Sequence, residues 1–262
     1  MKARSSLTTR SDPRGGRDPH APPGAPTGTW IDLGLWAPPG APLRPVRAWL
    51  PAKKLPNHAD RPALVLLDGQ NVFGDHGSFA GGWRADEAVA GMGTRRFRPP
   101  LILAVANGGA HRHIELGKDL PQFLIALAHE LLPRLRARLS LPVQVTLGGS
   151  SLGGLAALVG VRRHPEVFGA ALAMSPSLWF AHRTLLHELE REGLPARVRV
   201  YLDAGRRERG RMFTDAEHLA RVLQEQGLGK SRLLWRPDSR GAHHERHWRR
   251  RLPRALRFLF PA

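Results

Sequence analysis

The sequence predicts an α/β protein with a mostly parallel central sheet and helices on both faces. Three observations lead to this fold class. Short segments with strand patterns alternate with longer segments of helical periodicity through most of the chain. Two short segments, residues 63–67 and 101–105, are apolar throughout, as is typical of strands buried on both faces. Residues 143–161 combine a strand pattern, a glycine-rich turn and a helical segment.

Length and composition fit one domain. The chain has 262 residues, 42% of them hydrophobic, which is enough for the core of a single α/β sheet. Residues 1–28 are rich in Ser, Thr, Arg, Pro and Gly, so we expect a disordered or loosely attached tail there. We assign residues 29–262 to the single domain, because neither an internal repeat nor a second composition is visible.

The expected strands follow runs of apolar or alternating residues. They are residues 29–36, 46–50, 63–67, 101–105, 143–147, 167–174, 198–202 and 231–235. The expected helices are residues 121–139, 155–161, 183–191, 213–226 and 248–260. Functional groups in such sheets gather at the carboxyl ends of the strands, so the loops that follow the strands hold the candidate residues.

The turn after residue 147 has the pattern of a nucleophile elbow. Gly149-Ser150-Ser151-Leu152-Gly153 matches G-x-S-x-G and lies between an expected strand and an expected helix. We expect glycine on both sides of the serine because the turn is too sharp for a Cβ. The serine should have a strained backbone, and the first helical N–H groups should face a developing oxyanion. A Gly/Ser turn without a catalytic role is the alternative.

Other strand ends offer partners for this serine. The loop at residues 68–71 could supply a second oxyanion donor, the N–H of Gln70, beside the N–H of Leu152. It could also be a turn only. An acid should follow the serine in the sequence and precede a histidine. Glu208 lies in such a loop, and the rival acids are Asp203, Asp215 and Asp238.

The loop at residues 241–245 is where a catalytic histidine is expected, shortly before the last helix. His243 and His244 compete for this role, and position and spacing favour His243. With 13 histidines in the chain, a single histidine is more often a surface residue than a base. The cluster of His111 and His113 with Glu115 does not have convincing ligand spacing, so we expect no metal site.

The chain is strongly basic. Forty Lys and Arg residues face 22 Asp and Glu, for a formal net charge of +18, with local density at residues 205–211 and 244–254. No nucleic-acid-binding motif accompanies these residues, so a basic pocket for anionic substrates is the favoured interpretation and nucleic acid is not an expected partner. The chain has no cysteine, no apolar stretch near the ~20 residues of a membrane span, and no secretory h-region. We therefore expect a cytoplasmic protein with no membrane partner, and the oligomeric state stays open.

Several segments together resemble the esterase D/enterochelin-esterase-like branch of the α/β-hydrolases. The similarity covers roughly residues 44–261 and includes the elbow and the ending around Trp248. The matching segments are residues 67–73, 82–87, 107–115, 148–154, 164–169, 175–179 and 241–252. These segments together are much more specific than the G-x-S-x-G pattern alone.

This resemblance implies an α/β-hydrolase fold and a serine carboxylic-ester hydrolase that forms an acyl-enzyme, without cofactor or metal. By motif position, the nucleophile is Ser151 and not Ser150, the base is His243 and the acid is Glu208. The sequence departs from the family pattern at His244, where asparagine is usual, and at Leu116, where tyrosine is frequent.

The expected partner is a small-molecule ester. Trp83, Trp179 and Phe73 are candidates for an aromatic cleft, although core packing is the simpler explanation for any one of them. Asn107 and Arg112 are further substrate-binding candidates, and Arg112 would favour an ester that carries a carboxylate, catecholate or phosphate. Aryl, acyl and siderophore-type esters all fit. The alternatives are an acyltransferase on the same scaffold and a non-catalytic basic protein that binds polyanions.

Overall fold

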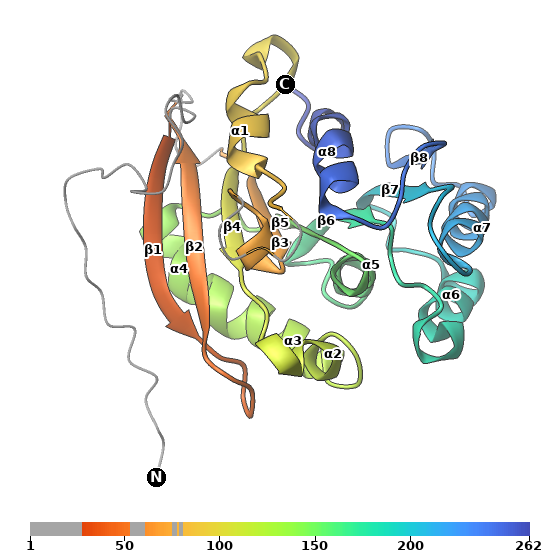
Figure 1. Ribbon diagram of the computed structural model, residues 1–262, viewed down its shortest axis with the longest axis horizontal. Helices are drawn as coiled ribbons and strands as arrows, with labels where there is room; N and C mark the ends of the chain where they lie inside the picture. The colour runs from red at the N-terminus through yellow and green to blue at the C-terminus, as the bar shows by residue number, and fades with distance from the viewer. Residues whose placement is uncertain (1–27, 53–60, 75–77, 79–80) are drawn as a thin grey trace.

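The computed structural model describes residues 28–52, 61–74, 78 and 81–262. In these residues, eight strands form one sheet in the order β1-β2-β4-β3-β5-β6-β7-β8, shown in Figure 1. The β1–β2 and β2–β4 pairs are antiparallel and the other five pairs are parallel. The strands are β1 Gly28–Trp36, β2 Arg44–Pro51, β3 Ala63–Leu67, β4 Leu101–Val105, β5 Val145–Ser150, β6 Phe168–Met174, β7 Arg199–Gly205 and β8 Leu233–Asp238. The predicted mostly parallel sheet is confirmed.

Helices cover both faces of the sheet, as predicted. The face that carries α3, α4, α5, α6 and α7 holds the larger core, and the face that carries α1 and α8 holds a second core around Trp83 and Trp248. The α-helices are α1 Ala85–Ala90, α2 Arg112–Glu115, α3 Leu120–Ala126, α4 Leu132–Leu139, α5 Leu152–Arg163, α6 Phe180–Glu192, α7 Met212–Glu225 and α8 Glu245–Leu259. A π-helical turn, η5 Leu127–Leu131, joins α3 to α4, and short 3₁₀ turns lie at η2 Gly69–Asn71, η3 Thr94–Arg96 and η4 Gly109–His111.

Three expected strands are shifted toward the C-terminus. The segment predicted at residues 143–147 begins at Val145, because Val143 is 72% exposed, and it continues through Gly148 and Gly149 to Ser150. A Cβ on Gly148 would lie 2.9 Å from the Cβ of Leu172 on the neighbouring strand, so glycine is what lets β5 pack there. The last two strands are displaced in the same direction: β7 runs from Arg199 to Gly205 and not from residue 198 to 202, and β8 runs from Leu233 to Asp238 and not from residue 231 to 235.

The helices differ from expectation in several places, and α5 and α8 each begin three residues before the predicted starts at 155 and 248. The segment 121–139 is helical throughout but contains the π turn. Pro133 lacks the N–H that would bond the carbonyl of His129, which explains irregular pairing at this point. In α6, residues Ala181, His182 and Arg183 have positive φ, so its regular part runs over residues 184–192, one residue later than the predicted 183–191. The helix α1 was not predicted, because its six residues are too few for a periodic signal.

The predicted tail at residues 1–28 lies outside the described residues except for Gly28, which is the first residue of β1. No helix in the described part of the chain is both long and apolar enough to cross a membrane.

Candidate active site

Ser151 lies at the turn between β5 and α5 in a backbone conformation that is rare outside glycine. Its φ is 57° and its ψ is −122°, and strain of this kind costs of order 1–3 kcal/mol, which the surrounding structure must offset. The sharpness of the turn explains its glycines. A Cβ on Gly149 would lie 2.7 Å from the carbonyl carbon of Gly153. The geometry is therefore that of the elbow expected from the sequence.

The hydroxyl of Ser151 contacts the hydroxyl of Ser177 at 3.1 Å. The backbones of the two segments are joined as well, because the N–H of Ser151 donates to Met174 and the N–H of Ser177 donates to the carbonyl of Ser151, each at 3.0 Å. In the described part of the chain, Ser151 makes no hydrogen bond with His243. Catalytic hydrogen bonds are often long in unliganded enzymes and tighten only when substrate binds.

The two expected oxyanion donors lie at the carboxyl ends of neighbouring strands. Leu152 is the first residue of α5, so its N–H has no acceptor within the helix. Gln70 lies in the turn η2 directly after β3, which pairs with β5. The side-chain oxygen of Gln70 accepts a hydrogen bond from the N–H of Asn107 at 3.2 Å, which ties this turn to the loop after β4.

Glu208 and His243 are hydrogen-bonded across the ends of β7 and β8. Nδ1 of His243 lies 3.2 Å from Oε2 of Glu208, so the tautomer with a proton on Nδ1 donates to the carboxylate. The Glu208 side chain is fully buried, whereas that of His243 is 32% exposed. The imidazole also packs edge-on against the indole of Trp248, with ring centroids 4.9 Å apart. A buried acid thus fixes the orientation of a partly accessible histidine.

Three donors keep Glu208 ionised. Burial acts to raise the pKa of its carboxyl, but hydrogen bonds from His243, Ser175 and the N–H of Gly205 outweigh burial and hold the pKa below its ordinary value. The Ser175 hydroxyl donates to Oε1 at 2.6 Å and the Gly205 N–H at 2.7 Å. The carboxylate is therefore available to stabilise an imidazolium on His243.

The rival acids have other partners. Asp203 is buried, accepts from the hydroxyl of Tyr201 at 3.0 Å and pairs with Arg251 at 3.2 Å. Burial raises the pKa of Asp203 to about 6. The charge of Arg251 and the hydrogen bonds that Asp203 accepts from Tyr201 and Ser175 oppose this rise. The remaining rivals pair with arginines, Asp215 with Arg183 and Arg211, and Asp238 with Arg250.

His244, the rival histidine, caps the N-terminus of α8. Its Nδ1 accepts a hydrogen bond from the N–H of Arg246 at 3.3 Å, and its side chain lies 3.8 Å from Glu245. Its contacts are therefore with the first turn of α8 and not with a buried carboxylate.

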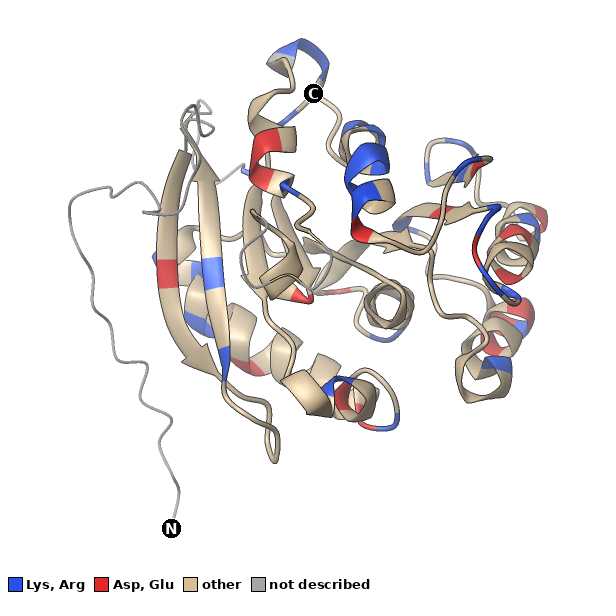
Figure 2. Cartoon of the chain, viewed as in Figure 1, with Lys and Arg blue, Asp and Glu red and all other residues tan. Residues whose placement is uncertain are grey.

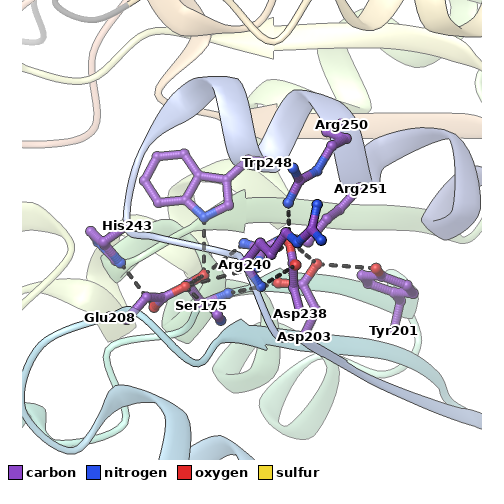
Figure 3. Close-up of polar contacts among 11 residues, drawn as sticks. Ser175, Tyr201, Asp203, Glu208, Asp238, Arg240, His243, Trp248, Arg250 and Arg251 are labelled. Carbon is purple, nitrogen blue, oxygen red and sulfur yellow. Dashed lines mark hydrogen bonds and ion pairs between the residues drawn. The ribbon is translucent and has the colours of Figure 1, made fainter.

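A buried layer of residues behind Glu208 was missed by sequence reasoning. Ser175 accepts hydrogen bonds from Trp248 Nε1 at 3.0 Å and from Arg251 Nη2 at 2.9 Å while it donates to Glu208. Figure 3 shows these side chains together with Asp203 and Tyr201 on one side of the Glu208–His243 pair. No single-sequence pattern joins residues so far apart in the chain, although Ser175, Trp248 and Arg251 all lie in segments that carry the family resemblance.

Asn107 and Arg112 converge on Asp68, another residue that sequence reasoning did not single out. Arg112 binds Asp68 through two hydrogen bonds of 2.6 and 2.7 Å, and the amide of Asn107 donates to the same carboxylate at 2.6 Å. Asp68 thus occupies two of the five N–H donors of the Arg112 guanidinium. The predicted binding role of Arg112 would need only its remaining, partly exposed surface, since the side chain is 22% exposed.

The aromatic candidates separate into buried and exposed residues. Trp83 is 3% exposed and packs against Trp248, so it belongs to the core and does not line a cleft. Phe73 is buried against Trp30. Trp179, in contrast, is 50% exposed and lies two residues after Ser177. Leu116, where the resembling family often has tyrosine, is buried in the main core.

The histidine cluster at residues 111–113 does not gather metal ligands in the structure. Its neighbour Glu115 is buried in an ion pair with Arg44 and accepts from the N–H of Gly108 at 2.9 Å. Among the described residues, the side chains whose ligand atoms lie close enough together to hold a metal ion are those of His129, His164 and Glu166.

An eight-stranded, mostly parallel sheet with a strained serine between β5 and α5 defines an α/β-hydrolase fold. Within this class, the chain belongs to the family described as "Putative esterase", whose model matches residues 43–259. The predicted resemblance to enterochelin-esterase-like proteins is thereby confirmed.

Curated relatives and solved structures give the same assignment. The iron(III) enterobactin esterase of Escherichia coli O6:H1 is 30% identical over 222 residues, 80% of this chain and 52% of the relative. The iron(III) salmochelin esterase of the same organism is 33% identical over 45% of this chain and 28% of its own length. The Shigella flexneri enterobactin esterase structure, determined with 2,3-dihydroxy-N-benzoyl-glycine, matches with a TM-score of 0.69 and 26% identity over 91% of this chain and 60% of that one. The chain thus spans about half the length of the iron(III) enterobactin esterase.

Proposed function

We propose that this protein is a serine esterase with Ser151 as nucleophile, His243 as base and Glu208 as the acid that orients the histidine. The observation that carries the proposal is the hydrogen bond between Glu208 and His243, because Glu208 is the buried carboxylate that contacts a histidine at the strand ends. The strained backbone of Ser151 supports the same assignment, and so does the membership of the chain in the esterase family.

The reaction follows from these roles. His243 takes the proton of the Ser151 hydroxyl, and the serine oxygen attacks the carbonyl carbon of the ester. The N–H groups of Leu152 and Gln70 stabilise the oxyanion that forms. His243 then protonates the departing alkoxide, and a water molecule activated by His243 hydrolyses the acyl-enzyme. None of these steps requires a cofactor or a metal, so dialysis against EDTA should leave the rate unchanged.

We propose an ester with an aromatic, siderophore-like acyl part as the substrate class. Half of Trp179 is exposed beyond Ser177, which offers a flat apolar surface for an aryl group. Several relatives are esterases named for iron(III) enterobactin or iron(III) salmochelin, which favours the same substrate class.

The substrate test compares enterobactin with simple aryl and alkyl esters at equal concentration, with products separated by chromatography. We expect release of 2,3-dihydroxy-N-benzoyl-serine from enterobactin and a lower kcat/KM for alkyl esters. The Trp179→Ala variant should lose the preference for aryl esters while its activity on acetate esters stays close to that of the wild type. Equal rates on aryl and alkyl esters would contradict the proposed substrate class. An ester product formed with an added alcohol, in place of hydrolysis, would instead show acyl transfer.

A further inference from the structure

Five arginines surround a hollow beside β8, the last strand of the sheet. The hollow has a volume of about 340 Å³, near the lower end of the ~300–1,000 Å³ of small-molecule sites. Arg236 comes from β8, Arg240 from the turn that follows, and the other three from α8. Figure 2 shows how densely basic residues follow α8. Ser151, Glu208 and His243 do not belong to the wall of the hollow, although Arg251 connects the wall to Glu208 through Ser175. The five arginines are Arg236, Arg240, Arg250, Arg251 and Arg254.

Among the described residues, two of the five arginines in this wall, Arg250 and Arg251, are paired with carboxylates. The carboxylate in the described part of the wall belongs to Asp238, which accepts a hydrogen bond from Arg250 at 2.7 Å. Within the described part of the chain, Arg236, Arg240 and Arg254 have no carboxylate partner within 4.0 Å. Like charges held around one hollow repel one another, so a bound anion would lower the free energy of the folded protein.

Arg251 is the buried arginine of this wall, and carboxylates balance its charge. Its side chain is only 7% exposed. Nη2 donates to Ser175 and Nε pairs with Asp203, but Nη1 lies 3.8 Å from Glu208 and 3.9 Å from Asp238, beyond hydrogen-bond distance. Nη1 makes no hydrogen bond to any described residue. Because Nη1 is also shielded from solvent, Arg251 adds positive charge to the wall, and the donors available to a ligand are those of the other arginines.

The geometry points to a site for a small phosphate-class anion that carries at least two charges, and we propose this as a binding site separate from the esterase site. The planar guanidinium of arginine binds phosphate oxygens through pairs of hydrogen bonds. The arginines of the wall come from two separate parts of the chain, β8 with its turn and α8. That arrangement suits a tetrahedral group, or two linked ones as in pyrophosphate, which presents oxygens in several directions.

The test is titration of the full chain with inorganic pyrophosphate by calorimetry at fixed ionic strength. We expect saturable one-to-one binding. Arg240 and Arg254 make no side-chain hydrogen bond or ion pair with described residues, so the R240Q/R254Q double variant should fold normally and bind at least about tenfold more weakly. The matched control is R138Q/R257Q, which removes the same charge from exposed positions outside the hollow, one of them on α8. This control should bind within about twofold of the wild type.

Two results would overturn the proposal. One is the absence of saturable pyrophosphate binding by the wild type. The other is equal weakening in both double variants, which would show a general charge effect. Ser151→Ala should bind pyrophosphate as the wild type does, so failure of the esterase proposal would leave this one intact. Competition with vesicles that contain phosphatidic acid then separates the sources of the phosphate. Displacement of pyrophosphate would support a lipid phosphate in this site, and persistence of its binding would support a free anion.

Discussion

The hydroxyl of Ser175 donates a hydrogen bond of 2.6 Å to Oε1 of Glu208. The same hydroxyl oxygen accepts from Trp248 and Arg251, and Ser175 is completely buried. Glu208 is thereby fixed on one carboxylate oxygen by Ser175 and Gly205, while the other oxygen faces His243. Ser175 is a positioning residue for the proposed acid, because it acts on His243 only through Glu208.

Ser175→Ala should lower kcat by about tenfold or more with little change in KM, because Glu208 loses a hydrogen bond that orients it. The free energy of unfolding should fall by about 1–3 kcal/mol, since Trp248 and Arg251 would keep buried donors without an acceptor. Steady-state kinetics and urea unfolding measure the two effects. A variant with reduced stability but unchanged kcat would restrict Ser175 to a structural role.

Glu208→Gln should reduce kcat/KM by about 10²- to 10⁴-fold, because a neutral amide neither fixes the His243 tautomer nor stabilises its imidazolium. Asp203→Asn is the matched control. It loses the pair with Arg251 but keeps the Glu208–His243 contact, so its activity should stay within about tenfold of the wild type. If the Glu208 variant retains full activity and the Asp203 variant does not, Asp203 is the acid.

Gly149→Ala should destabilise the protein by at least about 2 kcal/mol, because the new Cβ would lie 2.7 Å from the backbone of Gly153 in the elbow. Gly229→Ala serves as the control, since a Cβ at this position meets nothing within 4 Å. Its free energy of unfolding should change by no more than about 0.5 kcal/mol. Equal stability of the two variants in chemical unfolding would show that the turn tolerates a side chain.

Asp86 gives stability a defined pH dependence. Burial raises the pKa of its carboxyl to about 6, against the opposing hydrogen bonds of the backbone N–H groups of Glu87 and Asp86. The folded pKa is thus above the unfolded value of about 4, so the folded state loses stability as pH rises from about 4 to 6. Asp86→Asn should remove this loss and be more stable than the wild type at pH 8, by of order 1–3 kcal/mol, but not at pH 4. Unfolding at both pH values measures the difference, and an equal effect at each would contradict the assignment.

The sequence predicts the sheet well because its strands are buried. Ala63–Leu67 and Leu101–Val105 are apolar at every position, and the structure buries every one of these residues. The elbow could also be predicted from the sequence, since a turn this sharp requires glycine at Gly149. In contrast, α1 has six residues and its signal is too short, and the shift of β5 depends on the close approach of Leu172, a contact between distant parts of the chain.

The candidate site could be predicted only as far as short motifs extend. The proposed roles of Ser151, Glu208 and His243 follow from the order of loops along the chain and from the family resemblance. The link from Ser175 to Arg251 spans 76 positions, and the convergence of Asn107 and Arg112 on Asp68 spans 39 and 44. These contacts depend on the tertiary arrangement of the strands. For the same reason, the burial of Trp83 could not be separated in advance from a role in a cleft.

The central claim is that Ser151 attacks an ester carbonyl. The most direct test is hydrolysis of p-nitrophenyl acetate by the wild type and by Ser151→Ala, measured side by side, with Ser150→Ala as the neighbouring control. We predict p-nitrophenol release with an initial burst in the wild type and in the Ser150 variant, and a loss of at least about 10³-fold in the Ser151 variant. An inactive wild type, or a Ser151 variant as active as the wild type, would contradict the account.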